Sequence, residues 1–407
     1  MANTLVTPEW VTMETAFNFS NSLRGVQNFD RSYSDEYSQS GAKVGDTVKI
    51  RLPQMYETTE GEALTVQNIL DRTVQLILNR RRHVGIGWSS AQATTDLDEI
   101  RSRYITPAAD TLASVYDRVA LGDVYKQVYN MVGTLGTIPT AGLTYSTAVS
   151  KILDLAGKDE GLVAILSPLS NATIAASTSL MFHPGGKLAE NWTKGQFAAE
   201  QLGISKWFTD QNTPRFTSGA APAASTPLVN GASQTGSSVI TDGWGAGTAL
   251  VKGDVVSFAG VYWVNPLSKE STGRLAQFVL TADVSGTGPT LSISPSIITS
   301  GPLQNVTNAP ADNATVTFWT LVAGSTLAAT VGPQNLVFHP KAFATVMADL
   351  VMPNGGANAS RVKSKDLGVA MRFVEQFQIT TDQNLNRIDI LFGSTAVVPD
   401  WACRVTG

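Results

Sequence analysis

Apolar residues between positions 106 and 133 recur with a helical period and continue as a broad band that drifts around the helix axis. Thr106 suits the N-cap, Pro107 suits the first turn, and Gly133 suits the residue just past the end. The segment predicts one continuous helix of about 40 Å, at ~1.5 Å per residue. Because two of its sides are apolar, we expect a buried spine on which sheets are laid, although a long core helix of any α+β protein would look the same.

Two segments before this helix alternate apolar and polar residues, as half-buried strands do. Residues 45–52 and 73–87 predict a long antiparallel hairpin with a polar tip near residues 56–71. A two-stranded ribbon is marginally stable alone in water, so we expect it to pack on something else.

The charges of this hairpin fall into two groups. Glu57, Glu60 and Glu62 lie in the tip, whereas Arg80, Arg81 and Arg82 follow one another along one leg. Opposite charges at separated heights of one ribbon could not all pair within it, but they could pair between neighbouring copies. We therefore hypothesise that these six residues are inter-subunit contacts. A solvated charged face is the equal alternative.

The N-terminal region predicts a short helix after Thr7, with Trp10, Met13 and Phe17 on its apolar stripe. Residues 19–40 have little periodicity and several aromatic side chains, which predicts an extended arm. Such an arm could pack on its own core or on a neighbouring subunit.

Mixed helical and strand patterns follow the spine. Helices are predicted at residues 95–104, 144–156 and 171–179, a buried strand at 162–166, and a compact helix and strand within 187–208. Residues 335–350 predict strand, turn and helix, with Phe343, Met347 and Val351 on the helix. Further strands are predicted at 361–369, 371–380, 386–393 and 397–403.

Charge nearly vanishes between residues 216 and 332, where Gly, Ser, Thr, Pro and Asn dominate. Short apolar runs separated by turn residues predict an all-β barrel or sandwich inserted into the α/β layer. Its strands are expected at residues 238–241, 254–264, 277–282, 290–294 and 314–321.

Composition narrows the class of protein. Charged residues make up 15% of the 407-residue chain and the formal net charge is -4, against a usual charged share of about a quarter. A surface poor in charge suits burial against copies of itself. The slightly negative net charge does not favour sequence-specific binding of nucleic acid. We expect a soluble protein made in a cytoplasm, because no signal peptide or membrane span is recognisable and Cys403 alone allows no internal disulfide.

Chemical motifs are absent from the sequence. His183 and His339 each sit in a Phe-His-Pro triplet without a second ligand at metal-binding spacing, so we expect them to bond locally at strand ends. Glycine-rich pieces lack the Lys-Ser/Thr of a phosphate-binding loop, and Cys403 has no evident base partner. We therefore expect no catalytic, cofactor-binding or metal-binding residues, and a protein that is not an enzyme.

The order of arm, ribbon, spine helix, α/β layer and β-rich finish resembles the Hong Kong 97-type fold of tailed-phage major capsid proteins. Two motifs sharpen the resemblance to coat proteins of short-tailed, Salmonella-type phages with an inserted β-barrel. Residues 252–261 read KGDVVSFAGV, similar to a stretch in that barrel, and residues 335–343 read NLVFHPKAF, similar to the segment that follows it.

The resemblance implies an α+β capsid fold with an all-β inserted domain. It divides the chain into an N-terminal arm (1–40), an E-loop ribbon (41–90), the spine helix of the P-domain (91–135), an A-domain (136–215, returning at 334–360), the inserted barrel (216–333) and A/P-domain strands (361–407).

The implied function is self-assembly, as hexamers and pentamers, into the icosahedral shell of a virion that encloses double-stranded DNA. The implied partners are the chain itself, a scaffolding protein, a portal and nonspecifically bound packaged DNA on the inner face, with no membrane and no cofactor.

Two other classes of protein remain compatible with the sequence. A secreted or surface carbohydrate-binding protein could use exposed Trp244, Tyr262 and Trp263 to stack on sugars. A phage tail structural protein would form rings or tubes instead of shells.

Overall fold

The computed structural model describes residues 8–33, 47–62, 64, 66–68, 71–89, 104–178, 201–222, 225–318, 328–353, 358–364, 368–381 and 383–407. The chain forms two compact units. The first unit comprises residues 1–50, 74–121 and 344–395, and the second comprises residues 51–73, 122–343 and 396–407. Each unit is described by itself.

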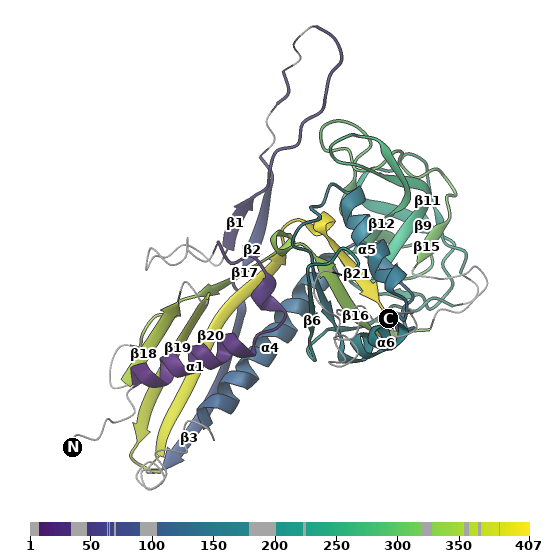
Figure 1. Cartoon of the computed structure of the whole chain (residues 1–407). Helices are drawn as coiled ribbons and strands as arrows, with labels where there is room; N and C mark the ends of the chain where they lie inside the picture. Colours follow the sequence, from purple (N-terminus) through teal and green to yellow (C-terminus); the bar gives the residue numbers. More distant parts are fainter. Residues whose placement is uncertain are drawn as a thin grey trace. The chain divides into compact units, whose positions relative to one another are not determined.

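The first unit is built on a sheet with the order β17-β20-β19-β18, in which β3 also pairs with β20 (Figure 1). Its strands are β17 (Phe343–Ala348), β18 (Asn358–Ser364), β19 (Val369–Gln378), β20 (Gln383–Ala396) and β3 (Arg80–Ser89). The antiparallel register places Arg372 and His83 on either side of Asp389. Alternation along β20 buries Ile388, Ile390 and Phe392 on one face.

Two helices cover that apolar face, α1 (Pro8–Ser22) and α4 (Thr106–Val124) (Figure 1). Tyr116 of α4 meets the ring of Phe392 edge-on, with centroids 4.6 Å apart, and Phe19 of α1 packs on Tyr116 at 5.7 Å. Edge-to-face contacts of this kind stabilise a core beyond the area they bury. The spine helix therefore forms the centre of the first unit's core.

The spine helix is shorter than predicted. After Val124 the chain passes through a 3-10 turn, η3 (Tyr125–Gln127), and then enters strand β4 (Met131–Gly133). The prediction of a continuous helix to residue 132 is therefore wrong. The apolar residues of this last part pair with β21 instead of continuing a helical face.

The predicted long hairpin is also divided. β1 (Thr47–Arg51) pairs with β2 (Thr73–Ile77), and the N–H of Leu52 bonds the carbonyl of Arg72 at 2.9 Å. After Ile77 the chain leaves the ribbon, because β3 pairs over its whole length with β20. Arg80, Arg81 and Arg82 thus belong to the five-stranded sheet and not to a ribbon leg.

The N-terminal helix buries a different face from the one predicted. Met13 and Phe17 are 70% and 54% exposed, whereas Val11, Ala16 and Phe19 are buried. Thr12 and Thr15 share the buried side because their hydroxyls bond Ser360 and the carbonyl of Val11. The prediction of an extended arm from residue 19 is wrong where α1 continues to Ser22.

The second unit contains an α/β layer. A sheet runs in the order β4-β21-β16-β5-β6, with β7 also paired to β16. The strands are β5 (Val163–Leu166), β6 (Lys206–Thr209), β7 (Arg215–Thr217), β16 (Val331–Phe338) and β21 (Ala402–Thr406). Helices α5 (Gly142–Asp154) and α6 (Pro168–Thr178) accompany it, and α5 packs on β4 and β21. Both helices and the strand at β5 were predicted.

The charge-poor segment is a β-rich domain, as predicted. Its main sheet has the order β15-β11-β12-β14-β9-β8, and β10 (Ala249–Leu250) pairs with β13 (Val284–Ser285). The main strands are β8 (Leu228–Val229), β9 (Gly236–Asp242), β11 (Val255–Val264), β12 (Ser271–Leu280), β14 (Thr290–Ile297) and β15 (Val316–Phe318). Phe258, Phe278 and Phe318 are fully buried in its core.

One predicted helix is a strand. After β16, the short turn η4 (Pro340–Ala342) leads into β17, and Phe343 to Met347 are all buried. Residue Val351 lies beyond the strand and is 81% exposed. The predicted strand at 397–403 begins later, because η5 (Pro399–Trp401) precedes β21. The predicted helix at 95–104 and most of residues 187–208 lie outside the described residues.

Candidate assembly surfaces

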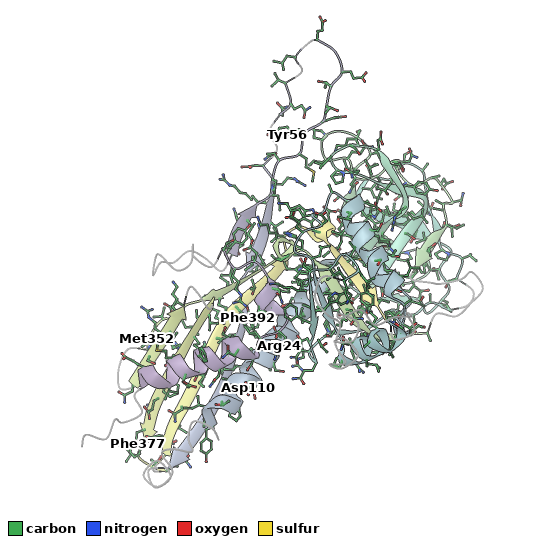
Figure 2. All side chains as sticks on the ribbon, viewed as in Figure 1. Arg24, Tyr56, Asp110, Met352, Phe377 and Phe392 are labelled. Atoms are coloured by element: carbon green, nitrogen blue, oxygen red, sulfur yellow. The ribbon has the colours of Figure 1, made fainter. Side chains whose placement is uncertain are left out.

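The acidic group of the sequence lies on the loop between β1 and β2. Glu57, Glu60 and Glu62 are all exposed, as are Tyr56 at 63% and Leu64 at 89%. Figure 2 labels Tyr56 on this loop. The backbone N–H of Glu57 bonds the side chain of Gln67 at 3.0 Å, which ties the two sides of the loop together. The loop thus presents three carboxylates and apolar side chains to solvent.

The basic group of the sequence lies at the start of β3, in the other unit. Arg80, Arg81 and Arg82 face Phe392, Leu391 and Ile390 across the ladder. Arg82 is exposed, while Arg81 also bonds Asp389 at 3.3 Å. The structure thus gathers the three arginines on one strand and the three glutamates on one loop.

Asp389 is the centre of a charge cluster that sequence reasoning missed. Its side chain is fully buried, and it accepts hydrogen bonds from Arg372 at 2.6 Å and Arg387 at 2.7 Å in addition to Arg81. Burial alone would raise the pKa of the carboxyl, but the hydrogen bonds and charges of Arg372 and Arg387 outweigh it and lower the pKa. Asp389 is therefore an anion around which three cations converge.

The register explains why this cluster faces away from the helices. Arg372 stands opposite Asp389, and Arg361 on β18 stands opposite Arg372. These side chains project from the face opposite Phe392, because successive residues of a strand alternate between faces. Arg361 is paired with Asp349 at 2.9 Å. The outer face of the sheet therefore carries more cations than anions, which suits an acidic partner.

A second polar cluster joins the β-rich domain to the α/β layer. Gln277 of β12 accepts hydrogen bonds at its amide oxygen from the backbone N–H of Met131 (2.8 Å) and from the ammonium of Lys151 (2.9 Å). Lys151 also donates to the carbonyl of Met131 at 2.7 Å, and burial lowers its pKa. Gln277 therefore caps the outer edge of β4, a backbone position that would otherwise require water or another strand.

An ion pair and further hydrogen bonds extend this junction. Arg274 pairs with Asp154 at 2.8 Å and bonds Ser150 at 2.7 Å. The side chain of Asn265 donates to the carbonyl of Asp154 at 3.0 Å, at the end of α5. We call the contacts of Lys151, Asp154, Arg274 and Gln277 the insertion clamp.

Arg404 is a fully buried cation beside the same junction. Its Nη1 donates to the carbonyl of Gly253 at 2.9 Å, within the KGD sequence of the β-rich domain. The neighbouring Asp254 is also fully buried and accepts from the N–H groups of Gly219 and Val251. Burial lowers the pKa of Arg404 to about 10, which leaves it charged at neutral pH. The KGD motif thus builds a turn that receives a cation from the α/β layer.

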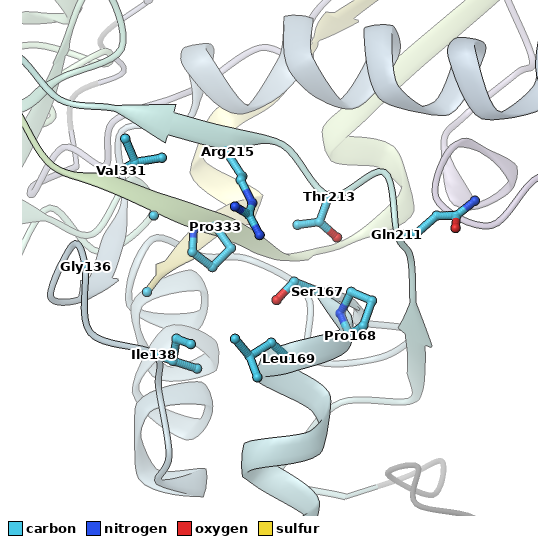
Figure 3. Close-up of a pocket in the computed structure, with 12 residues that line it drawn as sticks. Gly136, Ile138, Ser167, Pro168, Leu169, Gln211, Thr213, Arg215, Val331 and Pro333 are labelled. Atoms are coloured by element: carbon cyan, nitrogen blue, oxygen red, sulfur yellow. The ribbon is translucent and has the colours of Figure 1, made fainter.

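A cavity of about 440 Å3 opens in the α/β layer (Figure 3). Ile138, Pro168, Leu169, Val331 and Pro333 supply apolar lining, and Arg215 supplies the one charged side chain among the lining residues. The lining contains no carboxylate side chain, histidine or cysteine that could act as acid, base or nucleophile. Its apolar lining is suited to contact with an apolar group.

The proposed sugar-stacking surface is not formed. Trp244 and Trp263 are 3% and 5% exposed, and only Tyr262 of the three, at 37%, reaches solvent. Trp263 instead packs between Tyr129 and Phe278. The expectation of three exposed aromatic side chains is therefore wrong.

The remaining candidate residues have local roles. The Nδ1 of His339 accepts the N–H of Lys341 at 3.2 Å, which confirms the local hydrogen bond predicted at this strand end. Cys403 is buried, and burial raises the pKa of its thiol to about 11. Among the described residues, no group of three or more His, Cys, Asp or Glu side chains could hold a metal ion. No helix in the described part of the chain is long and apolar enough to span a membrane. His183 lies outside the described residues.

Comparison with known proteins identifies the family to which the chain belongs. A model of the P22 coat protein, gene protein 5, matches residues 19–407. No curated protein sequence matches the chain.

Solved structures with similar chains were also found. A structure of Mycobacterium phage Che8 is similar at 12% identity over 95% of this chain and 90% of that chain, with a TM-score of 0.45. The capsid of cyanophage P-SCSP1u is similar at 12% identity over 89% and 84% of the two chains, with a TM-score of 0.43. The CUS-3 coat protein I-domain is similar at 28% identity over 23% of this chain and 94% of that chain, with a TM-score of 0.19.

The family match, spanning nearly the whole chain, defines a major capsid protein of a tailed phage, whose copies assemble into the shell of the virion. The chain belongs to the P22 coat protein family. This confirms the resemblance read from residues 252–261 and 335–343, together with the α+β capsid fold and its β-rich domain. It also excludes the sugar-binding and tail-protein alternatives and gives the protein a structural, non-enzymatic role.

Proposed function

We propose that neighbouring subunits in the shell are joined by the acidic loop of one copy and the arginines of β3 in the next. The observation that carries this proposal is the exposure of Glu57, Glu60 and Glu62 on a loop that presents no basic side chain between Met55 and Gln67. Three carboxylates on one projecting loop favour a basic surface on another chain.

Arg82 is the leading partner on the basic side. Arg81 already bonds Asp389, so only part of its donor capacity remains for another chain. Arg80 and Arg82 stand opposite Phe392 and Ile390 in the ladder, and they therefore lie on the other face of the sheet from Arg81, Arg372 and Arg387. The neighbouring loop would thus meet Arg82, with Arg80 two residues away on the same face of β3.

Charge reversal tests this pairing. Arg82→Glu should reduce the yield of closed shells in sedimentation and negative-stain microscopy, and Glu60→Lys should do the same. The double variant Arg82→Glu/Glu60→Lys should recover shells, because the two charges are exchanged. Lys206→Glu, an exposed charge reversal on β6, serves as the matched control. Normal assembly of both single variants would contradict the pairing.

The shell is further proposed to be icosahedral, built from hexamers and pentamers around double-stranded DNA. A scaffolding protein and a portal are proposed partners, and DNA would contact the inner wall through nonspecific, salt-sensitive interactions. Family membership supports these partners. Assembly of the purified chain with and without its scaffolding protein, followed by microscopy, tests the first of them.

The domain boundaries are likewise proposed: an N-terminal segment with α1 at 1–40, a segment with the ribbon and β3 at 41–90, the spine region at 91–135, the A-domain at 136–215 and 334–360, the insertion at 216–333 and final strands at 361–407. The absence of any catalytic activity is also part of the proposal. It is supported by the cavity in the α/β layer, whose lining has no carboxylate side chain, histidine or cysteine.

A further inference from the structure

The turn that precedes β9 contains the dipeptide Asn230-Gly231. The side chain of Asn230 is exposed, and Gly231 has a φ of 96°, a backbone conformation that favours glycine. An asparagine followed by glycine is the arrangement most open to internal attack, because glycine has no Cβ to obstruct the approach of its backbone nitrogen to the preceding side-chain amide.

The backbone nitrogen that would attack is engaged elsewhere. The N–H of Gly231 donates to Oδ1 of Asp312 at 2.8 Å. The other oxygen of Asp312 accepts from the side-chain amide of Asn313 at 3.0 Å, and the N–H of Asn313 bonds the carbonyl of Val229 at 2.9 Å. The carboxylate is therefore held in place against the turn.

The turn is fixed from its other side by Gln234. Its amide nitrogen donates to the carbonyls of Asn230 (2.8 Å) and Gly231 (3.0 Å), and its amide oxygen accepts the N–H of Ile240 at 2.7 Å. The N–H of Asn230 bonds the carbonyl of Ile240 at 3.0 Å. Both peptide groups around the dipeptide are thus anchored to β9.

We propose that Asn230 is a deamidation site that Asp312 keeps unreactive in the folded subunit. Attack requires the Gly231 nitrogen to lose its proton and turn toward the Asn230 side chain. A carboxylate that accepts this N–H stabilises the protonated nitrogen and opposes the negative charge that deprotonation would create. The same hydrogen bond holds the nitrogen toward Asp312.

The reaction is an internal substitution without an external oxidant or reductant. A bond forms between the Gly231 nitrogen and Cγ of Asn230, the bond from Cγ to the side-chain nitrogen breaks, and the proton lost from Gly231 leaves with that nitrogen as ammonia. Water then opens the cyclic imide to aspartate or isoaspartate. Either product adds a negative charge next to Gly231, whose N–H bonds Asp312.

Peptide mapping of assembled shells tests the proposal. The parent and Asp312→Ala are incubated at mildly alkaline pH, digested, and analysed by mass spectrometry for conversion of Asn230. Asp312→Ala should convert about tenfold faster, the change expected when one hydrogen bond to a charged group no longer opposes the step. The parent chain in urea should convert faster than the folded parent.

Two further variants make the result specific. Asp312→Asn keeps an acceptor but removes the charge, so its rate should fall between those of the parent and Asp312→Ala. Asp283→Ala removes a comparable exposed carboxylate, which bonds the N–H of Lys252 at 2.7 Å, and should leave the rate at Asn230 unchanged. Circular dichroism verifies that each variant is folded. If Asp312→Ala does not fold, the comparison is made between the parent and Asp312→Asn.

An equal rate at Asn230 in the parent and in both folded Asp312 variants would overturn the proposal. Equal rates in the folded and urea-treated parent would overturn it as well.

Discussion

The hydroxyl groups of Tyr116 and Thr345 lie 2.8 Å apart in the core of the first unit, between the spine helix and β17. The hydroxyl of Thr345 also donates to the carbonyl of Gly393 at 3.2 Å, so Tyr116 donates to Thr345. Burial raises the pKa of Tyr116 to about 12, although Arg31 and the Thr345 hydrogen bond oppose the rise. The phenol therefore remains protonated, as a hydrogen-bond donor, through the physiological pH range.

This chain of hydrogen bonds, from Tyr116 through Thr345 to the carbonyl of Gly393, predicts unequal effects for two conservative substitutions. Tyr116→Phe removes the terminal donor and should lower the free energy of unfolding by about 1 kcal/mol. Thr345→Val leaves both the Tyr116 hydroxyl and the Gly393 carbonyl without that partner, and should cost about 2 kcal/mol or more. Urea midpoints of the unassembled subunit measure both changes. Equal losses in the free energy of unfolding would argue against this chain of hydrogen bonds.

Asp389 predicts a strong effect of charge removal. Asp389→Asn leaves the cations of Arg372, Arg387 and Arg81 without their shared anion. Removing one partner of a buried charge cluster costs about 3–5 kcal/mol, and we expect a loss toward the lower end because Arg81 and Arg387 are partly exposed. Urea unfolding of the subunit measures it, and Asp349→Asn, at the paired but more exposed Arg361, is the matched control.

The same carboxyl predicts the direction of a pH effect. Its pKa is lower in the folded chain than the ~3.9 of an unfolded aspartate. Its contribution to stability is therefore complete above the unfolded pKa and is lost as the pH falls through the folded pKa. The parent should lose more stability than Asp389→Asn when urea midpoints are compared between neutral pH and pH values below ~4. Parallel pH profiles would contradict this assignment.

Two glycines of residues 106–133, the segment predicted as one helix, should respond in opposite ways to alanine substitution: one change should raise stability and the other should lower it. Gly122 lies within α4, where an added Cβ meets no heavy atom within 4 Å, so Gly122→Ala should stabilise the subunit by up to about 1 kcal/mol. Gly133 lies in β4 with a φ of 98°, and an added Cβ would lie 2.4 Å from the carbonyl oxygen of Thr406. Gly133→Ala should destabilise by about 1–3 kcal/mol. Thermal melting of the two variants checks the sign of each change.

Removal of a residue of the insertion clamp should destabilise the edge of β4 locally. Gln277→Ala removes the acceptor shared by Lys151 and the N–H of Met131 and leaves the half-buried ammonium of Lys151 with fewer partners. The expected cost is about 1–3 kcal/mol, with faster hydrogen exchange at β4. Gln304→Ala, a glutamine within the β-rich domain that bonds the carbonyl of Val306, is the control. Unchanged exchange at Met131 in Gln277→Ala would show that the clamp does not hold this edge.

Much of the fold follows from local pattern. Helix α5 and the strand at β11 were predicted to within two residues, because amphipathic period and turn residues decide both. The coat-protein class came from two short motifs, and the structure gives one of them a physical role: Asp254 caps a buried turn, and the carbonyl of Gly253 receives Arg404.

The errors have two physical causes. Residues 343–347 are buried on both faces, and a short apolar run of this kind reads equally well as helix or strand. β3 leaves the ribbon because its partner β20 lies about three hundred residues later, where no local pattern can reveal the pairing. The Asp389 cluster was missed for the same reason, since its arginines come from three strands.

The hydrogen bonds at the edge of β4 limit how the β-rich domain can be exchanged between coat proteins of this family. The strand's outer N–H and carbonyl at Met131 are satisfied by side chains of Gln277 and Lys151, and Arg404 of the neighbouring strand donates to Gly253. The β-rich domain thus completes the hydrogen bonding of a sheet to which it contributes no strand. A grafted replacement that lacked an acceptor at position 277 would remove one acceptor of Lys151, and one that did not present the carbonyl of residue 253 in the same place would remove an acceptor of the buried Arg404. Exchange of this domain between coat proteins therefore requires matched residues at positions 151 and 404.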